Sequence, residues 1–413
     1  MFRNTWLPIA ADSPYSVHNL PYGVFSVGDG PRRVGVRIGD HVLDLAALAA
    51  ADALDAAEAL STKHLNAFMA LGPAVWRSTR AWLTGKLTDP VHRDQVLPHL
   101  LPLAGVRLHL PFEVADYVDF YASEHHAANL GKLFRPGSDP LTPNWKHLPI
   151  GYHGRAGTVV VSGTPITRPR GQRRPNAETP PVYGPSARLD IEAEIGFVVG
   201  VPTEPGAPMP ISQFAEHVFG VVVVNDWSAR DIQAWEYVPL GPFLGKSFAA
   251  TVSAWVVPLE ALAAARVSGP VQDPEPLPYL RVDEPWGLDL RLEVEWNGVV
   301  VSRPPFGQMY WSAAQQLAHL TANGASLRTG DFFASGTVPG PGRDQVGSFI
   351  ELSWNGTEPV TFADGSARTF LADGDRVTIR ATAPAADGGR IGFGEVTGII
   401  QPAGPEAVTS QGL

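Results

Sequence analysis

The sequence of 413 residues contains no cysteine. This absence excludes disulfides, thiolate zinc sites, iron–sulfur clusters and cysteine nucleophiles, so any bound metal must have oxygen or imidazole ligands. No apolar run approaches the roughly 18 residues of a membrane-spanning helix. The segment Met1–Pro14 shows no basic flank followed by an apolar core, so we expect no signal peptide. These absences predict a cytoplasmic protein with no membrane partner.

Positive charge is also scarce. Lys and Arg number 31 against 41 Asp and Glu, which gives a formal net charge of −10. Binding to nucleic acid without sequence preference needs basic patches that neutralise phosphates, so we expect no nucleic-acid partner. The charge balance still allows a small anionic substrate, because a metal and a few arginines can reverse the local field.

Motifs of several common enzyme classes are missing. There is no serine elbow, no Walker A loop, no HExxH sequence and no glycine fingerprint after a strand. The enzyme hypothesis that remains is chemistry at an oxygen-ligated metal, with water as the nucleophile.

Glycine and proline are abundant, with 42 and 39 residues spread along the chain, which favours a β-rich fold with many turns. Periodicity in the first part predicts short strands at Tyr22–Val27 and Arg33–Ile38 and helices at about Leu45–Leu60, Thr62–Leu71 and Ala74–Leu83. Regular structure is then interrupted by Pro90, Pro98, Pro102 and Pro111. We therefore expect an N-terminal domain at residues 1–112 and a C-terminal domain at residues 113–413.

The sequence pattern of residues 113–413 predicts a mixed or antiparallel β structure, a barrel or a roll, with long loops. One amphipathic helix is predicted at Tyr310–Ala322, ended by Asn323-Gly324. The expected fold class is therefore β-rich α+β. The predicted strands include Gly157–Ser162, Leu189–Val199, Val218–Val224, Leu288–Trp296, Ser348–Trp354 and Arg376–Ile379.

Alternating carboxylates stand out in the predicted strand Leu189–Val199. Residues two apart in a strand share a face, so Asp190, Glu192 and Glu194 are expected to project together. Such alternation is also typical of a solvated strand edge, in which case the carboxylates bind nothing. The run Phe197–Val199, however, is typical of a strand buried on both faces. Carboxylates next to such a strand would repel one another unless a cation joined them.

Two further segments carry polar residues next to predicted strands. Asp226 directly follows the β-branched run Val221–Val224, where it either belongs to a site or caps the next turn. Asp119 precedes a polar stretch that is predicted to be helical and that contains His125 and His126. Adjacent side chains on a helix diverge by about 100°, so only one of the two histidines can face a pocket. A single histidine is more often structural than catalytic, and the pattern alone leaves both interpretations open.

These segments occur in the order found in the fumarylacetoacetase family, and together they resemble it over nearly the whole chain. The run through Tyr237 and Lys246 is the most specific part of the resemblance. The matching segments are Asn19–Phe25, Asp119–Tyr121, Asn144-Trp145, Leu148–Arg155, Asp190–Glu194, Asn225–Gln233, Trp235–Phe248, Ser335–Thr337, Glu351–Trp354 and Arg390–Gly394. The resemblance implies a small SH3-like N-terminal β domain with helices, a C-terminal mixed β-roll domain and a homodimer.

The resemblance also implies roles for individual residues. His126 falls on the family's general base, and Glu351 on the residue that orients it. The polar cluster at the reacting carbonyl falls on Arg230, Gln233 and Lys246. Four carboxylates fall on the metal ligands and suit Mg²⁺ or Ca²⁺, namely Asp119, Glu192, Glu194 and Asp226. The substrate contacts fall on Tyr121, Arg135, Tyr152, Gln233, Tyr237 and Thr337. Family members often carry Thr where this chain has Ala250, so we do not expect a second cation near Lys246.

The function implied by the resemblance is metal-dependent hydrolysis of the carbon–carbon bond of 4-fumarylacetoacetate. The expected products are fumarate and acetoacetate, in the last step of tyrosine and phenylalanine catabolism. An alternative is a hydrolase or decarboxylase of another acylpyruvate or diketo acid on the same fold. Hydrolysis needs the base pair of His126 and Glu351, whereas a decarboxylase can act with the metal alone. A silent metal-binding scaffold would be expected to lack at least one of these residues, and the sequence retains all of them.

Overall fold

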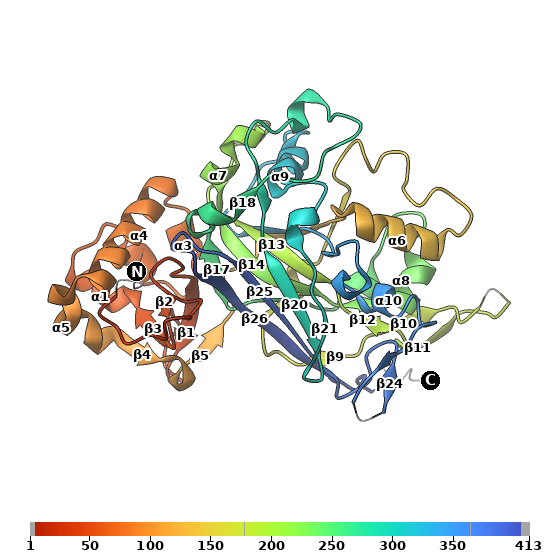
Figure 1. Cartoon of the computed structure of the whole chain (residues 1–413), viewed down its shortest axis with the longest axis horizontal. Coiled ribbons are helices and arrows are strands. Elements are labelled where there is room, and N and C mark those ends of the chain that lie inside the picture. Colours follow the sequence, from red (N-terminus) through yellow and green to blue (C-terminus); the bar gives the residue numbers. More distant parts are fainter. Residues whose placement is uncertain (1–4, 177, 364, 406–413) are drawn as a thin grey trace, which may run out of the picture.

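A computed structural model describes residues 5–176, 178–363 and 365–405 of the chain. A smaller N-terminal part with many short helices lies at one end of the molecule, and a larger part with long strands makes up the rest (Figure 1). Within the described ranges, no helix is long and apolar enough to cross a membrane.

The N-terminal part combines an antiparallel sheet with short helices. Its strands are β1 (Tyr22–Ser26), β2 (Arg33–Ile38), β3 (His41–Asp44), β4 (Leu100–Pro102) and β5 (Arg107–His109). Its helices are α1 (Leu45–Ala51), α2 (Ala57–Leu60), α3 (Asn66–Met69), α4 (Pro73–Thr88) and α5 (Arg93–Val96). The two predicted strands are confirmed. The predicted helix Leu45–Leu60 is wrong in its middle, because Ala53 has a positive φ of 51° that separates α1 from α2.

The C-terminal part contains two large groups of strands. The first group continues the N-terminal sheet and consists of β6 (Asp116–Phe120), β7 (Gly151–His153), β8 (Val159–Val161), β13 (Ala193–Val199), β14 (Val218–Asp226), β16 (Ala250–Val252), β17 (Trp255–Pro258) and β22 (Asp331–Ala334). The second group consists of β9 (Ile166–Thr167), β20 (Arg291–Trp296), β21 (Val299–Ser302), β25 (Arg376–Pro384) and β26 (Arg390–Gln401).

Smaller elements complete this part. Four short antiparallel pairs are β10 (Arg170–Arg173) with β11 (Val182–Pro185), β12 (Leu189–Asp190) with β15 (Ser228–Ala229), β18 (Arg266–Val267) with β19 (Gly287–Leu288), and β23 (Val360–Thr361) with β24 (Ala367–Arg368). The helices are α6 (Glu124–Phe134), α7 (Phe214–His217), α8 (Arg230–Glu236), α9 (Ala313–Thr321) and α10 (Phe349–Leu352). The predicted helix at Tyr310–Ala322 is confirmed as α9, which begins at a capping box between Ser312 and Gln315.

One sheet joins the two parts of the chain, because β1 pairs antiparallel with β17. From there the order runs β17-β14-β13-β22-β6-β7, with β13 and β14 buried along their whole length. Most pairs in this sheet are antiparallel, but β22 with β6 and β16 with β8 are parallel. The β-rich α+β class and the mixed strand directions are therefore as predicted, while the SH3-like description of the N-terminal part stays a prediction.

Two predicted strands are wrong in ways that matter for the site. The segment predicted as the strand Ser348–Trp354 is the short helix α10, which ends where Trp354 and Asn355 adopt positive φ values of 45° and 58°. The predicted strand Leu189–Val199 is interrupted after Asp190 and resumes at Ala193. Both errors have one cause: the carboxylate of Asp190 accepts hydrogen bonds from the backbone N–H groups of Phe349 and Ile350, at 2.7 and 3.0 Å. This contact fixes the start of α10 on the interrupted strand.

Candidate active site and metal centre

Four carboxylates meet inside the C-terminal part. Asp119 lies on β6, Glu194 on β13 and Asp226 on β14, while Glu192 lies in the interruption before β13. One oxygen from each lies within 4.8 Å of the others, and all four residues are buried. The strands bring them together because β14, β13, β22 and β6 are neighbours in one sheet. The carboxylates predicted as metal ligands therefore form a single cluster.

Asp190 does not belong to this cluster, contrary to the expectation that it projects with Glu192 and Glu194. Its Oδ2 instead accepts from Nε of Arg230 at 2.8 Å. The interruption after Asp190 changes the alternation that the prediction assumed. The solvated-edge interpretation is also excluded, because Asp190, Glu192 and Glu194 are 0%, 5% and 0% exposed.

The cluster holds more negative charge than its neighbours neutralise. Burial raises the pKa of Asp119 well above its ordinary value, and the carboxylate of Asp226 raises it further. Burial likewise raises the pKa of Glu194 well above its ordinary value, with repulsion from Asp119 as the next cause. One oxygen each of Asp119, Glu194 and Asp226 is buried and has no hydrogen-bond partner in the described part of the chain. These free oxygens fit a hard divalent cation, which prefers carboxylate ligands.

Lys246 lies against one side of the cluster. Its Nζ is 2.5 Å from Oε2 of Glu192 and also forms an ion pair with Asp226. Burial alone would lower the pKa of Lys246, but the two carboxylates outweigh burial and raise it. For Glu192, burial would raise the pKa, yet Lys246 and Arg230 together lower it. Glu192 is therefore ionised and already paired, unlike Asp119 and Glu194.

Tyr152 closes the other side. Its hydroxyl donates to Oδ2 of Asp119 at 2.8 Å and lies 3.1 Å from Oδ2 of Asp226. Burial raises the pKa of Tyr152 well above its ordinary value, and Asp119 raises it further, so the phenol stays protonated. A neutral hydroxyl at this position can hold the two carboxylates in place without adding negative charge.

The predicted base pair is present next to the cluster. His126 lies on α6, whose N-terminus is capped by Ser123. Nδ1 of His126 is 2.8 Å from Oε2 of Glu351 on α10, and Nε2 is 3.7 Å from Oε1 of Glu192. The neighbouring His125 is not part of this arrangement, so the helix selects one of the two histidines as expected. An ionised carboxylate only accepts hydrogen bonds, which places the proton of a neutral imidazole on Nδ1 and leaves Nε2 free as a base.

Glu351 is held by more than His126. Asn129 donates from Nδ2 to Oε1 at 2.9 Å, and Ser348 donates from Oγ to Oε2 at 2.7 Å. Burial would raise the pKa of Glu351, but His126 and these hydrogen bonds lower it. Sequence reasoning missed both partners. Asn129 follows His126 by three residues on α6, and this spacing is the signal that could have revealed it.

Arg230 and Gln233 lie one helical turn apart on α8. Nη1 of Arg230 is 2.8 Å from Oε1 of Glu192 and donates to Oε1 of Gln233 at 3.2 Å. Because Oε1 of Gln233 is occupied, its NH₂ group remains as the donor on this side chain. Arg230 itself is buried and does not line the pocket. It contacts Glu192 and Gln233, which do, and holds their side chains in position.

A pocket of about 420 Å³ opens beside the carboxylates. Its lining contains nine of the predicted site residues, namely Asp119, Tyr121, His126, Arg135, Tyr152, Glu192, Gln233, Tyr237 and Lys246. Glu194, Asp226, Arg230, Glu351 and Thr337 do not line it and lie behind its wall. Thr337 is 1% exposed, and its hydroxyl lacks a hydrogen-bond partner among the described residues. The predicted residues thus either line one pocket or lie directly behind its wall.

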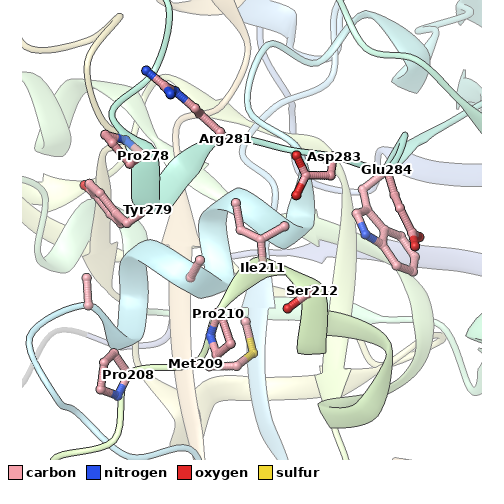
Figure 2. A pocket seen from close by; sticks show the side chains of 13 residues that line it. Pro208, Met209, Pro210, Ile211, Ser212, Pro278, Tyr279, Arg281, Asp283 and Glu284 are labelled. Carbon is pink, nitrogen blue, oxygen red and sulfur yellow. The ribbon is translucent and has the colours of Figure 1, made fainter.

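A larger cavity of about 730 Å³ lies elsewhere, between the segment before α7 and the segment 278–286 (Figure 2). Figure 2 shows Arg281 pointing away from Asp283 and Glu284. The charged side chains that line this cavity therefore do not converge on one point. Arg281 pairs with Glu275 at 3.0 Å, and Glu284 pairs with Arg266 at 2.8 Å. Size alone therefore does not locate the chemistry, since only the smaller pocket combines a base, a cation and a carboxylate cluster.

Nearly the whole chain matches known family models and proteins. The family model described as "Fumarylacetoacetate (FAA) hydrolase C-terminal" matches residues 116–400, and the one described as "Fumarylacetoacetase N-terminal" matches residues 18–111. The chain is 48% identical to the fumarylacetoacetase of Homo sapiens over 97% of this chain and 99% of that protein. It is 43% identical to the fumarylacetoacetase of Arabidopsis thaliana, with the same coverage.

A solved structure has a similar fold. The fumarylacetoacetate hydrolase from the psychrophile Exiguobacterium antarcticum aligns with a TM-score of 0.53 at 18% identity. The alignment covers 93% of this chain and 99% of that chain. At this level of identity the likeness supports the fold alone. The evidence for the activity comes from the relatives with 43% and 48% identity.

Proposed function

This chain belongs to the fumarylacetoacetase family. On that premise we propose a role for each residue of its pocket in the hydrolysis of a carbon–carbon bond. The enzyme is a hydrolase acting on carbon–carbon bonds, and its reaction is the hydrolysis of fumarylacetoacetate. The single observation that carries the proposal is the buried pair of His126 and Glu351. Nε2 of His126 in this pair lies 3.7 Å from Oε1 of Glu192, a member of the carboxylate cluster.

His126 acts as the general base. Its Nε2 takes a proton from water, whose oxygen then bonds to the fumaryl carbonyl carbon. Glu351 keeps the other ring proton on Nδ1 and stabilises the imidazolium that forms. When the carbon–carbon bond breaks, the imidazolium returns the proton to the departing carbon of acetoacetate. The atoms of one water are thus divided between fumarate and acetoacetate.

Hydrogen-bond donors, one of them cationic, stabilise the oxyanion that forms on the attacked carbonyl. Lys246 and the NH₂ group of Gln233 both line the pocket, and they are aimed before the substrate binds. Arg230 fixes Gln233 and Glu192 through its hydrogen bonds, so its contribution is to their position. Removing any of these groups is expected to lower the rate of the chemical step.

The substrate is anionic and needs cationic or hydroxyl partners. Arg135 lines the pocket and forms no ion pair among the described residues, although it donates to the carbonyl of Pro140 at 2.8 Å. Its guanidinium is therefore available to a carboxylate of the substrate. We assign the remaining contacts to Tyr121, Tyr152, Tyr237 and Thr337, with Thr337 offering its unpartnered hydroxyl after a small movement of the wall.

The metal site is proposed for Mg²⁺ or Ca²⁺, held by Asp119, Glu192, Glu194 and Asp226. Four carboxylates without a soft ligand favour these hard cations. When bound, the cation supplies Lewis acidity toward the diketo oxygens of the substrate. The small side chain of Ala250 offers no ligand, so we propose no second cation near Lys246.

The wider setting follows from the family. We propose that the reaction completes tyrosine and phenylalanine catabolism, and that the protein acts in the cytoplasm as a homodimer. We also propose a division into an N-terminal domain of residues 1–112 and a catalytic domain of residues 113–413. The cluster, the base pair and the pocket all lie in the second of these.

The test is the loss of fumarylacetoacetate, followed by its ultraviolet absorbance. Purified protein is assayed with added Mg²⁺ or Ca²⁺ and again after exhaustive chelation. His126→Ala should lose activity by about 10²-fold to 10⁴-fold, whereas the adjacent His125→Ala serves as a matched control and should keep it. Equal activity of both variants would sink the assignment of the base, and turnover of only simpler acylpyruvates would redirect the substrate.

A further inference from the structure

Asp190 is a buried carboxylate that neither lines the catalytic pocket nor belongs to the carboxylate cluster. Its Oδ1 accepts hydrogen bonds from the backbone N–H groups of Ile191 and Phe349, both at 2.7 Å. Its Oδ2 accepts from the backbone N–H of Ile350 at 3.0 Å and from Nε of Arg230 at 2.8 Å. An ionised carboxylate offers about four acceptor sites, so donors of the protein itself occupy the whole of this one.

The backbone hydrogen bonds connect Asp190 to the base pair. Phe349 and Ile350 begin α10, and the next residue is Glu351, whose Oε2 lies 2.8 Å from Nδ1 of His126. Because α10 contains only four residues, a shift of its first turn moves Glu351 as well. The carboxylate of Asp190 therefore sets where Glu351 lies relative to His126.

The bond to Arg230 connects Asp190 to the other nitrogen of the same imidazole. Nη1 of Arg230 lies 2.8 Å from Oε1 of Glu192, and this oxygen lies 3.7 Å from Nε2 of His126. The contacts thus close a ring that starts at Asp190, passes through α10 and the imidazole, and returns through Glu192 and Arg230. Both neighbours of His126 in this ring, Glu351 and Glu192, are fixed from one carboxylate.

We propose that Asp190 is a positioning residue for the hydrolysis, whose carboxylate holds the imidazole of His126 in its reactive orientation. The inference deepens the proposed function and rests on it, because it takes His126 as the base. Asp190 acts through Glu351 and Arg230 and does not touch the substrate. Its carboxylate is needed, since a carboxamide would turn an NH₂ group toward an N–H donor that now meets an oxygen.

Packing holds α10 in the core independently of this charge. The ring of Phe349 stacks on Trp296, with 4.2 Å between centroids and 12° between planes. Ile350 is also fully buried. Loss of the carboxylate is therefore expected to displace Glu351 and not to unfold the chain. A displacement of about 1 Å near a catalytic group can lower the rate about 100-fold.

The test compares Asp190→Asn with Asp375→Asn as a matched control. Asp375 is also buried, and its carboxylate accepts from the backbone N–H of Ala372 at 2.8 Å and from Nδ2 of Asn297 at 2.9 Å. It does not line the catalytic pocket. With saturating Mg²⁺, kcat of Asp190→Asn should fall about 100-fold and KM should change less than about threefold. The control should keep both values.

A double variant separates positioning from a general loss of stability. If Asp190 acts through the base pair, its replacement in the Glu351→Gln background should lower kcat by less than about threefold more. Losses that multiply in the double variant would contradict this route. Asp190→Glu keeps the charge but displaces it by one methylene, so its kcat should lie between those of the wild type and Asp190→Asn. Should Asp190→Asn fail to fold, Asp190→Glu carries the test.

NMR of protein labelled with ¹⁵N-histidine reads the base pair without turnover. The Nδ1 proton of His126 should give a downfield signal that is absent from His126→Ala. Asp190→Asn should shift or broaden this signal, whereas Asp375→Asn should leave it unchanged. A folded variant of Asp190 with the wild-type signal or the wild-type kcat would overturn the proposal. If the wild type did not hydrolyse fumarylacetoacetate, the proposed function would fail, and the NMR signal would still test the positioning.

Discussion

The two halves of the catalytic site are equally buried but differ in how their carboxylates are stabilised. Glu351 accepts three hydrogen bonds from His126, Asn129 and Ser348, and its pKa is lowered although burial acts to raise it. Asp119 and Glu194 each keep one oxygen without a partner, and burial raises the pKa of both. The difference shows that burial does not set these pKa values by itself. The neighbouring charges decide the direction, because His126 lowers the pKa of Glu351 while nearby carboxylates raise the pKa of Asp119 and Glu194. The half in which carboxylates face one another is the half that could hold a cation.

The largest effect on kcat should come from a change in the half that contains His126 and Glu351. Glu351→Gln removes the charge that stabilises the imidazolium and allows the wrong tautomer, so kcat should fall by about 10³-fold to 10⁴-fold. The affinity for Mg²⁺ should stay within about threefold, since Glu351 is not a ligand. Steady-state kinetics and metal titration on the same preparation check this, and a large loss of metal affinity would contradict the separation of the two halves.

A variant in the other half should behave in the opposite way. Glu194→Gln removes one charge from the cation site, and the affinity for Mg²⁺ or Ca²⁺ should fall at least about 10-fold. Activity at low metal should be lost, and excess metal should restore much of it. The activity is measured against metal concentration after chelation. If saturating metal left kcat as low as in Glu351→Gln, Glu194 would have a role in the chemical step that this comparison does not give it.

A smaller effect tests the support behind the base pair. Asn129→Ala removes one hydrogen bond to an ionised carboxylate, worth about 1.5–3 kcal/mol, so kcat should fall about 10-fold to 100-fold. KM should change little, because Asn129 does not line the pocket. His125→Ala, on the same helix, is the control. An effect on KM alone would mean that Asn129 acts on substrate binding and not on Glu351.

The smallest effect concerns stability in acid. The pKa of Glu351 in the folded protein lies below its ordinary value of 4.5. Its contribution to the free energy of unfolding is therefore present above the unfolded pKa and is lost as the pH falls through the folded pKa. The difference in stability between the wild type and Glu351→Gln should shrink below about pH 4.5. Urea unfolding at several pH values measures this, and a difference that grows in acid would contradict the sign.

Much of the site could be predicted from the sequence, because its parts lie in short segments with recognisable patterns. Asp226 at the end of a buried strand and the alternation of Glu192 and Glu194 pointed to a cation before any contact was known. The pairing of His126 with Glu351 came only from the family resemblance, since the residues are separated by 225 positions. No local pattern carries a contact of that range.

The failures have the same origin. The role of Asp190 and the helix α10 depend on each other, because the carboxylate of Asp190 holds the N-terminus of a helix about 160 residues later. Periodicity predicts a continuous strand at one segment and a strand at the other, and both predictions are reasonable locally. Tertiary hydrogen bonds override them.

The most direct test of the comparison is calorimetry of Ca²⁺ binding to the chelated wild type over a series of pH values. Burial raises the pKa of Asp119 and Glu194, so protons compete with a cation for these carboxylates. We predict one Ca²⁺ per chain, with an affinity that falls as the pH falls, that is kept in Glu351→Gln and that is reduced in Glu194→Gln. No binding by the wild type, or equal binding by Glu194→Gln, would contradict the claim that the buried carboxylate cluster is completed by a cation.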